Sequence, residues 1–515
     1  MSEYMAGNHQ VPILVGVGEF KNVSRKMEDA IEPSELMLKA IHEAATDAIG
    51  PQEQSLIKDL DGVSVVASST WPYTDLPGLL SKALHIQPKH TVYSDLSGNS
   101  SVQLIDDAAQ RIASGELEAV AVVGGESLAS LKDFMKRGMF PPPWTGPGTN
   151  LDNVYYANNV QTLGGIGKAH EVGVPMQVYA MYENGLRAHR GQTIAQNHQE
   201  SVRLYARYAQ VAASHQMAWS FGKMPETESS IGTVNRRNRM ICFPYPLLMN
   251  AFNDVNLAAA CIVTSQAYAE RRGIPREKWI FPLGGGRGHD SEDSMAEALS
   301  TSLARSELRV DDIDIFDFYS CFPIVPKLAC QYLGISIDNP PRPITLLGGL
   351  TSFGGAGANY SMHAVTEMVR CLRARRCGGH ERSNGLILAN GGVLTHENAL
   401  CLSTRPRPNG TPYPVDEFDN NCSVSEGQVA VVPATTGEAT IETYTVEYDR
   451  QNNPRLGHVV CRLKGTDSRV LANHGDHSTL QQLASGTEEP IGRGGFVWQS
   501  ERPGQNLFSF RKSHL

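Results

Sequence analysis

The same order of predicted strands, helices and glycine-rich segments occurs twice along the chain, and this repeat constrains the fold more than any other feature. The first copy runs from about residue 11 to Gly124-Gly125, and the second from about residue 279 to Gly391-Gly392. Two unrelated α/β domains could also alternate strands and helices. The shared order, with an apolar strand ending at Gly-Gly in both copies, favours duplication.

Within each copy an apolar strand, a helix and a second strand precede a glycine-rich turn, a second helix and a closing strand. Such alternation predicts largely parallel sheets covered by helices. The glycine runs at 284–288 and 354–357 are predicted turns that permit positive φ or close backbone approach, and neither has the spacing of a nucleotide-binding motif. Helices are expected at 33–49, 102–114, 294–306 and 360–373, and strands at 11–17, 59–66, 119–123, 279–283, 312–318 and 386–388.

An insert and an extra domain complete the predicted organisation. We expect an N-terminal half at 1–270, which includes an insert at about 127–246, and a C-terminal half at 271–405. The insert holds helical stretches near 176–189 and 197–215. After a proline-rich linker, residues 406–515 carry β-type runs and predict a small barrel or sandwich. These runs are 428–432, 439–447, 458–463 and 494–499.

Charge and cysteine spacing exclude several classes of function. The net charge of −9 and the pI near 6.0 give no general electrostatic reason to bind nucleic acid. No apolar run approaches the roughly 20 residues that span a bilayer. The nine cysteines are scattered without paired CxxC clusters, so no metal site is expected, and they are typical of a reducing compartment.

The last three residues, Ser513-His514-Leu515, are similar to a C-terminal peroxisomal address of the Ser-Lys-Leu type. A chance match is the alternative. We therefore expect a peroxisomal protein recognised by an import receptor, and otherwise a cytoplasmic one.

Several motifs together resemble the thiolase superfamily. Residues 96–127 are similar to the thiolase nucleophile loop with its helix and strand, 317–322 to the segment that carries a catalytic His or Asn, and 348–357 to the glycine-rich catalytic segment. Residues 252–256 and 390–396 also match thiolase-like proteins. The likeness points to type-1 thiolase-like proteins and sterol-carrier-protein-type thiolases. It implies a duplicated α/β fold layered α-β-α-β-α, followed by a small β-rich additional C-terminal domain. A homodimer is compatible with the resemblance, and the oligomeric state stays open.

The residues that perform thiolase chemistry are replaced in these motifs. By this alignment Ser97 stands where thiolases have the nucleophilic cysteine, and Tyr319 stands where they have a histidine. Gly355 replaces the histidine that activates the cysteine, and Ala389 replaces the second cysteine. A serine hydroxyl needs a strong adjacent base to attack a thioester. An ordinary thiolase mechanism is therefore not expected.

Four side chains are candidates for other chemistry, each with a structural alternative. Ser97 is either a nucleophile or oxyanion-binding residue, or an N-cap in a Ser/Asn/Gly turn. Tyr319 either donates a hydrogen bond to a thioester oxygen or fills the space of the missing histidine. Cys321 is either reactive or a buried inert thiol. His396 is the candidate general base, or else a loop histidine.

The resemblance also implies a coenzyme A ligand, with no covalently bound cofactor. Arg236, Arg237 and Arg239 are candidates for its phosphates, or else form a solvated loop. Gly354 and Gly355 are candidates for close approach to its pantetheine arm. The sequence thus predicts a protein that handles CoA thioesters, with acyl transfer or β-ketoacyl-CoA cleavage by a non-standard site. The alternative is a non-catalytic homologue that binds CoA or a protein partner.

Overall fold

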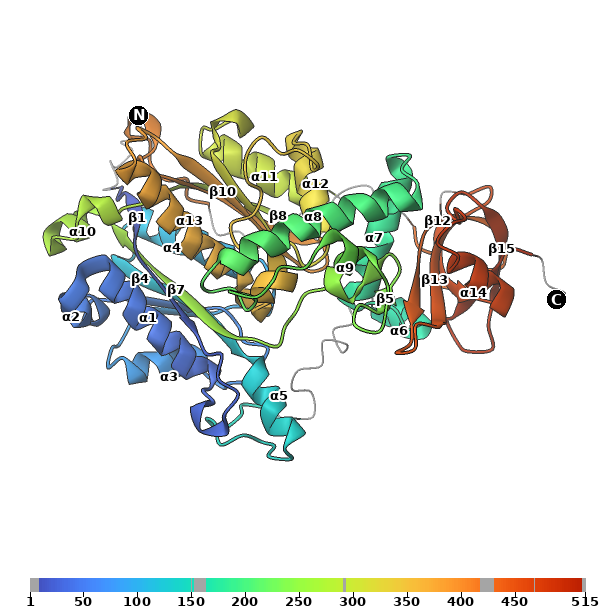
Figure 1. The fold of residues 1–515 in the computed structure, drawn as a ribbon. Helices are drawn as coiled ribbons and strands as arrows, with labels where there is room; N and C mark the ends of the chain where they lie inside the picture. The colour runs from blue at the N-terminus through green and yellow to red at the C-terminus, as the bar shows by residue number, and fades with distance from the viewer. Residues whose placement is uncertain are drawn as a thin grey trace, which may run out of the picture.

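The computed structural model describes residues 9–149, 151, 164–289, 293–416, 430–466 and 468–511, and its core is built on two mixed sheets (Figure 1). The first sheet has the order β1-β7-β4-β2-β3 and the second β8-β11-β10-β9. The first sheet comprises β1 (Pro12–Lys21), β2 (Gly62–Val65), β3 (His90–Tyr93), β4 (Ala119–Ser127) and β7 (Asn256–Ser265). The second comprises β8 (Phe281–His289), β9 (Ile315–Phe318), β10 (Asn384–Gly391) and β11 (His396–Ser403).

The two sheets repeat one topology, which confirms the predicted duplication. Strand β1 corresponds to β8, β7 to β11, β4 to β10 and β2 to β9. In both sheets the first two pairings are antiparallel and the third is parallel. The predicted parallel direction holds for every strand of the two sheets except β7 and β11, which return antiparallel to the others and were not predicted. Both strands are almost entirely buried, so they lack the alternating pattern that marks a strand.

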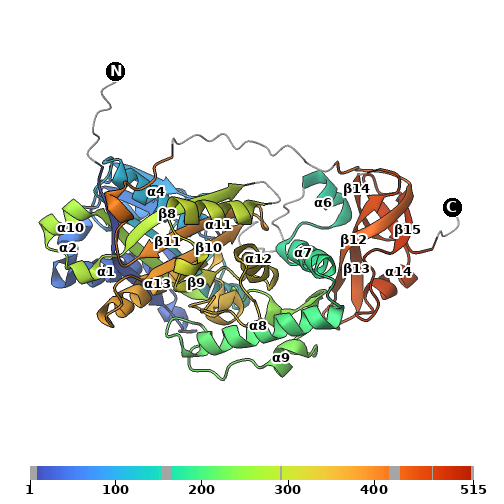
Figure 2. The same ribbon diagram turned by 90° about the horizontal axis from the view of Figure 1, so that it is seen from above.

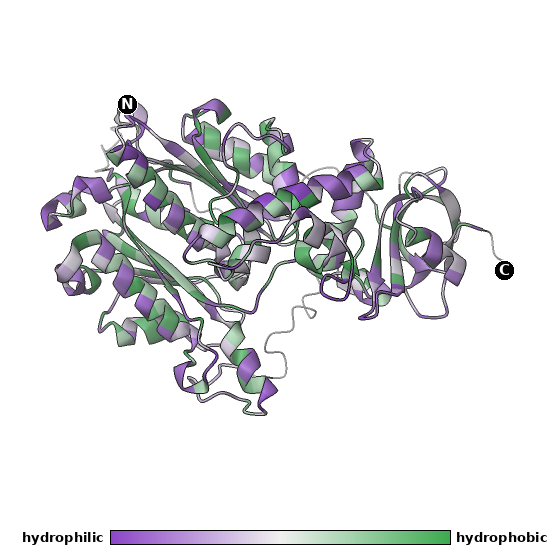
Figure 3. Cartoon of the chain, in the orientation of Figure 1, coloured by the Kyte–Doolittle hydropathy of each residue, from purple (hydrophilic) through white to green (hydrophobic). Residues whose placement is uncertain are grey.

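The helices form three layers around the sheets (Figures 1 and 2). Helix α1 packs on β1 and β7, α11 packs on β8 and β11, and α4 and α13 lie between the sheets and contact both. Figure 3 shows hydrophobic colour along the buried strands and hydrophilic colour on the outer helix faces. The bounds are α1 (Pro33–Ile49), α2 (Glu53–Lys58), α3 (Leu76–Ala83), α4 (Ser100–Ala113), α10 (Gln266–Arg272), α11 (Ser294–Arg305), α12 (Ile324–Leu333) and α13 (Tyr360–Cys377).

The glycine run at 284–288 lies inside strand β8 and is not the predicted turn. A Cβ on Gly286 would lie 2.1 Å from the carbonyl oxygen of Ala298, and one on Gly288 would lie 1.9 Å from that of Ser294. Both carbonyls belong to α11. The glycines therefore serve close helix-on-strand packing rather than positive φ.

The C-terminal domain is a closed five-stranded barrel with the order β13-β14-β16-β15-β12, in which β12 also pairs with β13. It comprises β12 (Gly437–Tyr448), β13 (Pro454–Leu463), β14 (Arg469–His474), α14 (His477–Leu483), β15 (Gly494–Gln499) and β16 (Asn506–Ser509). Two short insert strands, β5 (Met240–Cys242) and β6 (Tyr245–Pro246), extend its sheet, with Cys242 opposite Glu447. The barrel and the insert thus share one hydrogen-bonded β-sheet.

The insert comprises α5 (Leu128–Lys136), α6 (Gly164–His170), α7 (Pro175–His189), α8 (Ile194–Ser214) and α9 (Glu228–Gly232). A buried lysine joins two of these helices to the second half of the core. The Nζ of Lys327 on α12 lies 2.6 Å from Glu183 Oε1 on α7, and 3.0 Å from Glu200 Oε1 on α8. It also donates to Asn197 and Ser201 on α8. Because its four partners come from α7 and α8, Lys327 fixes the insert against the core.

Across the described ranges, no helix combines the length and hydropathy that a membrane crossing requires.

Candidate functional site

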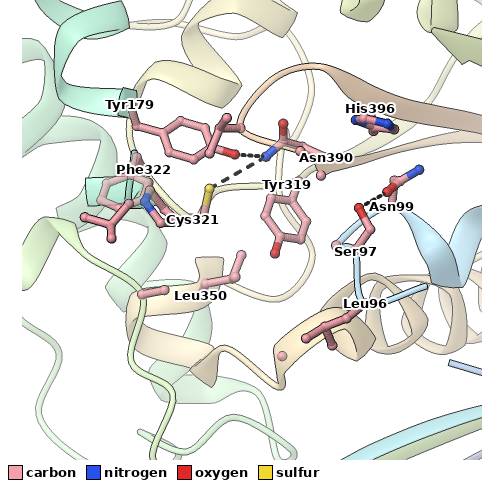
Figure 4. A pocket seen from close by; sticks show the side chains of 18 of the residues that line it. Leu96, Ser97, Asn99, Tyr179, Tyr319, Cys321, Phe322, Leu350, Asn390 and His396 are labelled. Carbon is pink, nitrogen blue, oxygen red and sulfur yellow. Dashed lines mark hydrogen bonds between the residues drawn. The ribbon is translucent and has the colours of Figure 1, made fainter. Parts of the chain in front are cut away.

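A cavity of about 1530 Å³ lies where the two halves, the insert and the barrel meet (Figure 4). Five of the nine candidate residues line it: Ser97, Arg239, Tyr319, Cys321 and His396. The other four, Arg236, Arg237, Gly354 and Gly355, are absent from its lining. The cavity therefore brings the four candidate catalytic side chains together with one of the candidate CoA-binding arginines.

Ser97 lies in the loop before α4 and is held by amide groups. Its hydroxyl donates to Oδ1 of Asn99, whose Nδ2 donates to Oδ1 of Asn398 at 2.7 Å. A Cβ on Gly391 would lie 2.0 Å from Ser97 Oγ, so the glycine admits the loop against the end of β10. Within the described ranges, no histidine or carboxylate accepts the Ser97 proton, and the N-cap of α4 is Asn99 rather than Ser97. The hydroxyl thus lacks the base that a serine nucleophile requires.

Tyr319 and Cys321 follow strand β9. The Tyr319 backbone N–H donates to the Leu388 carbonyl at 3.0 Å, and its ring meets Tyr360 edge-on at 5.5 Å. Burial, with smaller contributions from Cys321 and Glu397, raises the pKa of Tyr319 well above its usual value. The phenol is therefore neutral and able to donate a hydrogen bond.

The Cys321 thiol is held in its neutral form. Burial raises the pKa of Cys321 to about 12. Because the thiolate is the nucleophilic form, burial disfavours Cys321 as a nucleophile.

Two cavity residues were not identified as candidates from the sequence. Nδ2 of Asn390 donates to the Tyr179 hydroxyl at 2.7 Å and approaches Cys321 Sγ at 3.7 Å. Tyr179 comes from α7 of the insert and stacks on Phe322 at 4.8 Å. Asn390 could have been predicted as a site residue, because it lies in a segment that matches thiolase-like proteins. Nothing in the insert sequence indicates that Tyr179 lines the cavity.

His396 is the first residue of strand β11. In Figure 4 its side chain lies apart from those of Tyr179 and Cys321. Its Nδ1 lies 2.8 Å from the Thr395 hydroxyl, and its ring meets His289 at 5.2 Å across the strand pair. The half-buried imidazole lines the cavity, so it can exchange protons with a ligand or solvent there. It is the candidate histidine that lines the cavity.

Glu397 is a buried carboxyl next to this site. It lies opposite Asn390 in the β10–β11 pair, and neither of its side-chain oxygens has a hydrogen-bond partner among the described residues. Burial raises the pKa of Glu397 well above its ordinary value. The side chain is therefore neutral in the folded protein over a pH range in which it ionises in the unfolded chain.

Replacement of Glu397 by Gln should stabilise the protein at pH 8. In the wild type the folded state keeps a proton that the unfolded state releases, so stability falls as pH rises above the ordinary glutamate range. The amide cannot ionise, and this decline should disappear. Urea unfolding of both proteins between pH 5 and pH 8 measures the difference. Glu501→Gln, at an exposed position, is the matched control. Parallel pH profiles for wild type and Glu397→Gln would contradict the prediction.

The candidate CoA-binding residues divide into two groups. Arg236 and Arg237 are exposed, whereas Arg239 is half-buried in the cavity wall. Gly354 has a φ of +115°, and a Cβ on Gly355 would lie 2.4 Å from Asn253 Oδ1. These two glycines therefore serve the packing of the loop behind the cavity.

Comparisons with known proteins agree with this fold. A crystal structure described as a monomeric SCP2-thiolase like protein type 1 from Mycobacterium smegmatis matches 97% of this chain and 99% of its own, with a TM-score of 0.78 and 26% identity. The family described as Thiolase-like protein type 1 additional C-terminal domain matches residues 424–502. The chain belongs to the thiolase superfamily.

Further comparisons give a partial sequence match and two more distant similarities of fold. A probable acetyl-CoA acetyltransferase of Mycolicibacterium smegmatis is 27% identical over 144 residues, which span 25% of this chain and only 35% of that relative. Human mitochondrial 3-ketoacyl-CoA thiolase, solved in complex with CoA, shares the fold with a TM-score of 0.54 and 14% identity over 77% of this chain and 98% of its own. A structure named Ltp2-ChsH2(DUF35) aldolase shares it with a TM-score of 0.55 and 18% identity over 76% of this chain and 97% of its own.

Proposed function

We propose that this thiolase-like protein binds CoA thioesters in the cavity and acts on them without forming an acyl-enzyme. One observation carries the proposal: the cavity lies where the motif-bearing loops of the two halves meet, yet neither of its candidate nucleophiles has a histidine or carboxylate hydrogen-bond partner among the described residues. Ser97 donates to an amide oxygen, and Cys321 is a neutral thiol. Catalysis would then depend on groups that polarise the thioester carbonyl and move protons.

Two side chains fit those tasks. The neutral Tyr319 phenol would donate to the thioester oxygen, together with N–H groups of the glycine-rich loop. His396 would transfer the proton. Direct acyl transfer, cleavage of a β-ketoacyl thioester and hydrolysis all agree with this arrangement. The rival is a non-catalytic homologue that binds CoA or a protein partner.

Mass spectrometry and calorimetry test the proposal together. After incubation with acetyl-CoA or acetoacetyl-CoA, the intact mass should show no acylation, and calorimetry should show binding of CoA. Acylation that Ser97→Ala or Cys321→Ala abolishes would overturn the non-covalent mechanism. Binding without turnover would favour the rival, and absence of binding would exclude both.

Cleavage of a carbon–carbon bond by aldol chemistry is a second candidate, favoured by the lack of an activated nucleophile among the cavity residues that the structure describes. In such a reaction a base removes the proton of a β-hydroxyl, the Cα–Cβ bond breaks to release an aldehyde or ketone, and the Cα carbanion takes up a proton. These steps need a base and a donor to the thioester oxygen, which His396 and Tyr319 would supply. Release of a carbonyl compound from a β-hydroxyacyl-CoA, detected with a hydrazine reagent, distinguishes this reaction from acyl transfer.

We also propose a peroxisomal location, which rests on Ser513-His514-Leu515 alone; these residues lie outside the described ranges. A fluorescent protein fused to the N-terminus should place the full chain in peroxisomes of a eukaryotic cell. Deletion of the last three residues should return it to the cytosol. A diffuse signal from the full chain would contradict the proposal.

A further inference from the structure

The C-terminal barrel forms part of the cavity wall. Glu447, Tyr448 and Arg455 of the barrel line the same cavity as Ser97 and Tyr319. The barrel is held in place by more than the shared sheet. Asn184 of α7 donates to the Tyr444 carbonyl at 3.0 Å, and the buried Arg187 of the same helix pairs with Glu489. The barrel is therefore a fixed wall of the site.

Two arginines line this end of the cavity, one from the insert and one from the barrel. Arg239 immediately precedes β5, and Arg455 pairs with Glu447, which lies opposite Cys242 of β5 in the shared sheet. Arg239 donates to the carbonyl of Met240 at 3.4 Å and has no carboxylate partner within the described ranges. Its charge is thus available to a ligand.

The acidic groups beside them are already neutralised. Glu447 pairs with Arg455 and with His458, at 2.9 Å from the latter. These contacts offset the effect of burial and lower the pKa of Glu447 to about 2. Glu171, which also lines the cavity, pairs with Arg502 at 2.7 Å. Arg239 therefore adds a positive charge that these ion pairs leave uncompensated, and a polyanion would complement it.

We propose that Arg239 and Arg455 bind the nucleotide phosphates of CoA, so that the additional domain supplies half of a phosphate clamp. The inference rests on the proposed function, since it assigns one end of the same ligand. It gives the barrel a role in recognition, with the acyl end of the ligand at Tyr319. Arg236 and Arg237, which do not line the cavity, would contribute little.

Calorimetry with CoA and with pantetheine tests the clamp. Arg455→Gln and Arg239→Gln should each weaken CoA binding about tenfold, because a hydrogen bond to a charged group is lost. Binding of pantetheine, which carries no phosphate, should not change. Arg236→Gln is the matched control from the same basic cluster and should bind CoA like the wild type. Thermal melts would verify that each variant is folded.

The possible results separate the two proposals. Unchanged CoA binding by Arg455→Gln would overturn the clamp and leave the proposed function standing. Equal weakening of CoA and pantetheine would also overturn it, because the effect would not involve phosphate. If the wild type binds neither ligand, the proposed function itself fails.

Discussion

Replacement of Lys327 by Met is expected to destabilise the protein by about 3–5 kcal/mol, the cost of removing one partner from a buried ion pair. The methionine side chain is similar in length and carries no charge. It would leave Glu183 buried without the ammonium group that now lies 2.6 Å away, whereas Glu200 would keep Arg190 at 3.5 Å. Among the described residues, Glu183 would retain the Tyr245 hydroxyl, at 2.7 Å, as its side-chain partner. The contacts between the insert and the core should be weakened most, because Lys327 joins these two parts.

Denaturant unfolding of the purified variant gives this free energy. Lys464→Met is the matched control, because Lys464 pairs with Glu438 on the exposed surface of the barrel, where a pair contributes about 0–1 kcal/mol. The double variant Lys327→Met, Glu183→Gln should recover part of the loss, since it removes the carboxylate that is left without a cation. Equal effects for Lys327→Met and Lys464→Met would show that the buried network does not hold the insert.

Replacement of Tyr319 by Phe is expected to lower turnover of a CoA thioester about 100-fold, as loss of one oxyanion-hole donor does. The change removes only the hydroxyl, and the ring keeps its edge contact with Tyr360. Because CoA bound as proposed would also contact other parts of the cavity, its affinity should be preserved. The comparison needs kcat with the thioester on which the wild type is active, together with calorimetry for CoA.

Tyr360→Phe is the control for this experiment. Tyr360 touches the Tyr319 ring but does not line the cavity, so loss of its hydroxyl should leave kcat close to the wild-type value. If Tyr319→Phe also keeps full turnover, the phenol is not the donor. Tyr319 would then only fill space.

Local signals in the sequence were sufficient for much of the fold. The helix expected at 33–49 is α1, with the same bounds, because its apolar residues recur at helical spacing. The predicted strand ends at residue 283, because glycine is ordinarily a turn signal, whereas β8 continues to His289. The glycines of β8 allow α11 to pack closely on the strand. This tertiary contact cannot be predicted from the residues around the glycines alone.

The site was accessible to sequence reasoning only in part. Ser97 and Tyr319 could be named because they replace catalytic residues of a recognised motif. Tyr179 reaches the cavity from the insert, and its position depends on tertiary packing of α7. The unpartnered state of Glu397 depends on what surrounds β11, which no local pattern encodes.

The sheet shared by the barrel and the insert also sets an order of events during synthesis. Cys242 pairs with Glu447, so the β5–β6 hairpin must wait for 205 further residues (447 minus 242) to leave the ribosome. At about 5–20 residues per second this delay is roughly 10–40 s. Until then the edge of the hairpin is open to incorrect pairing. Nascent chains of this protein should therefore depend on chaperones until the last domain has emerged.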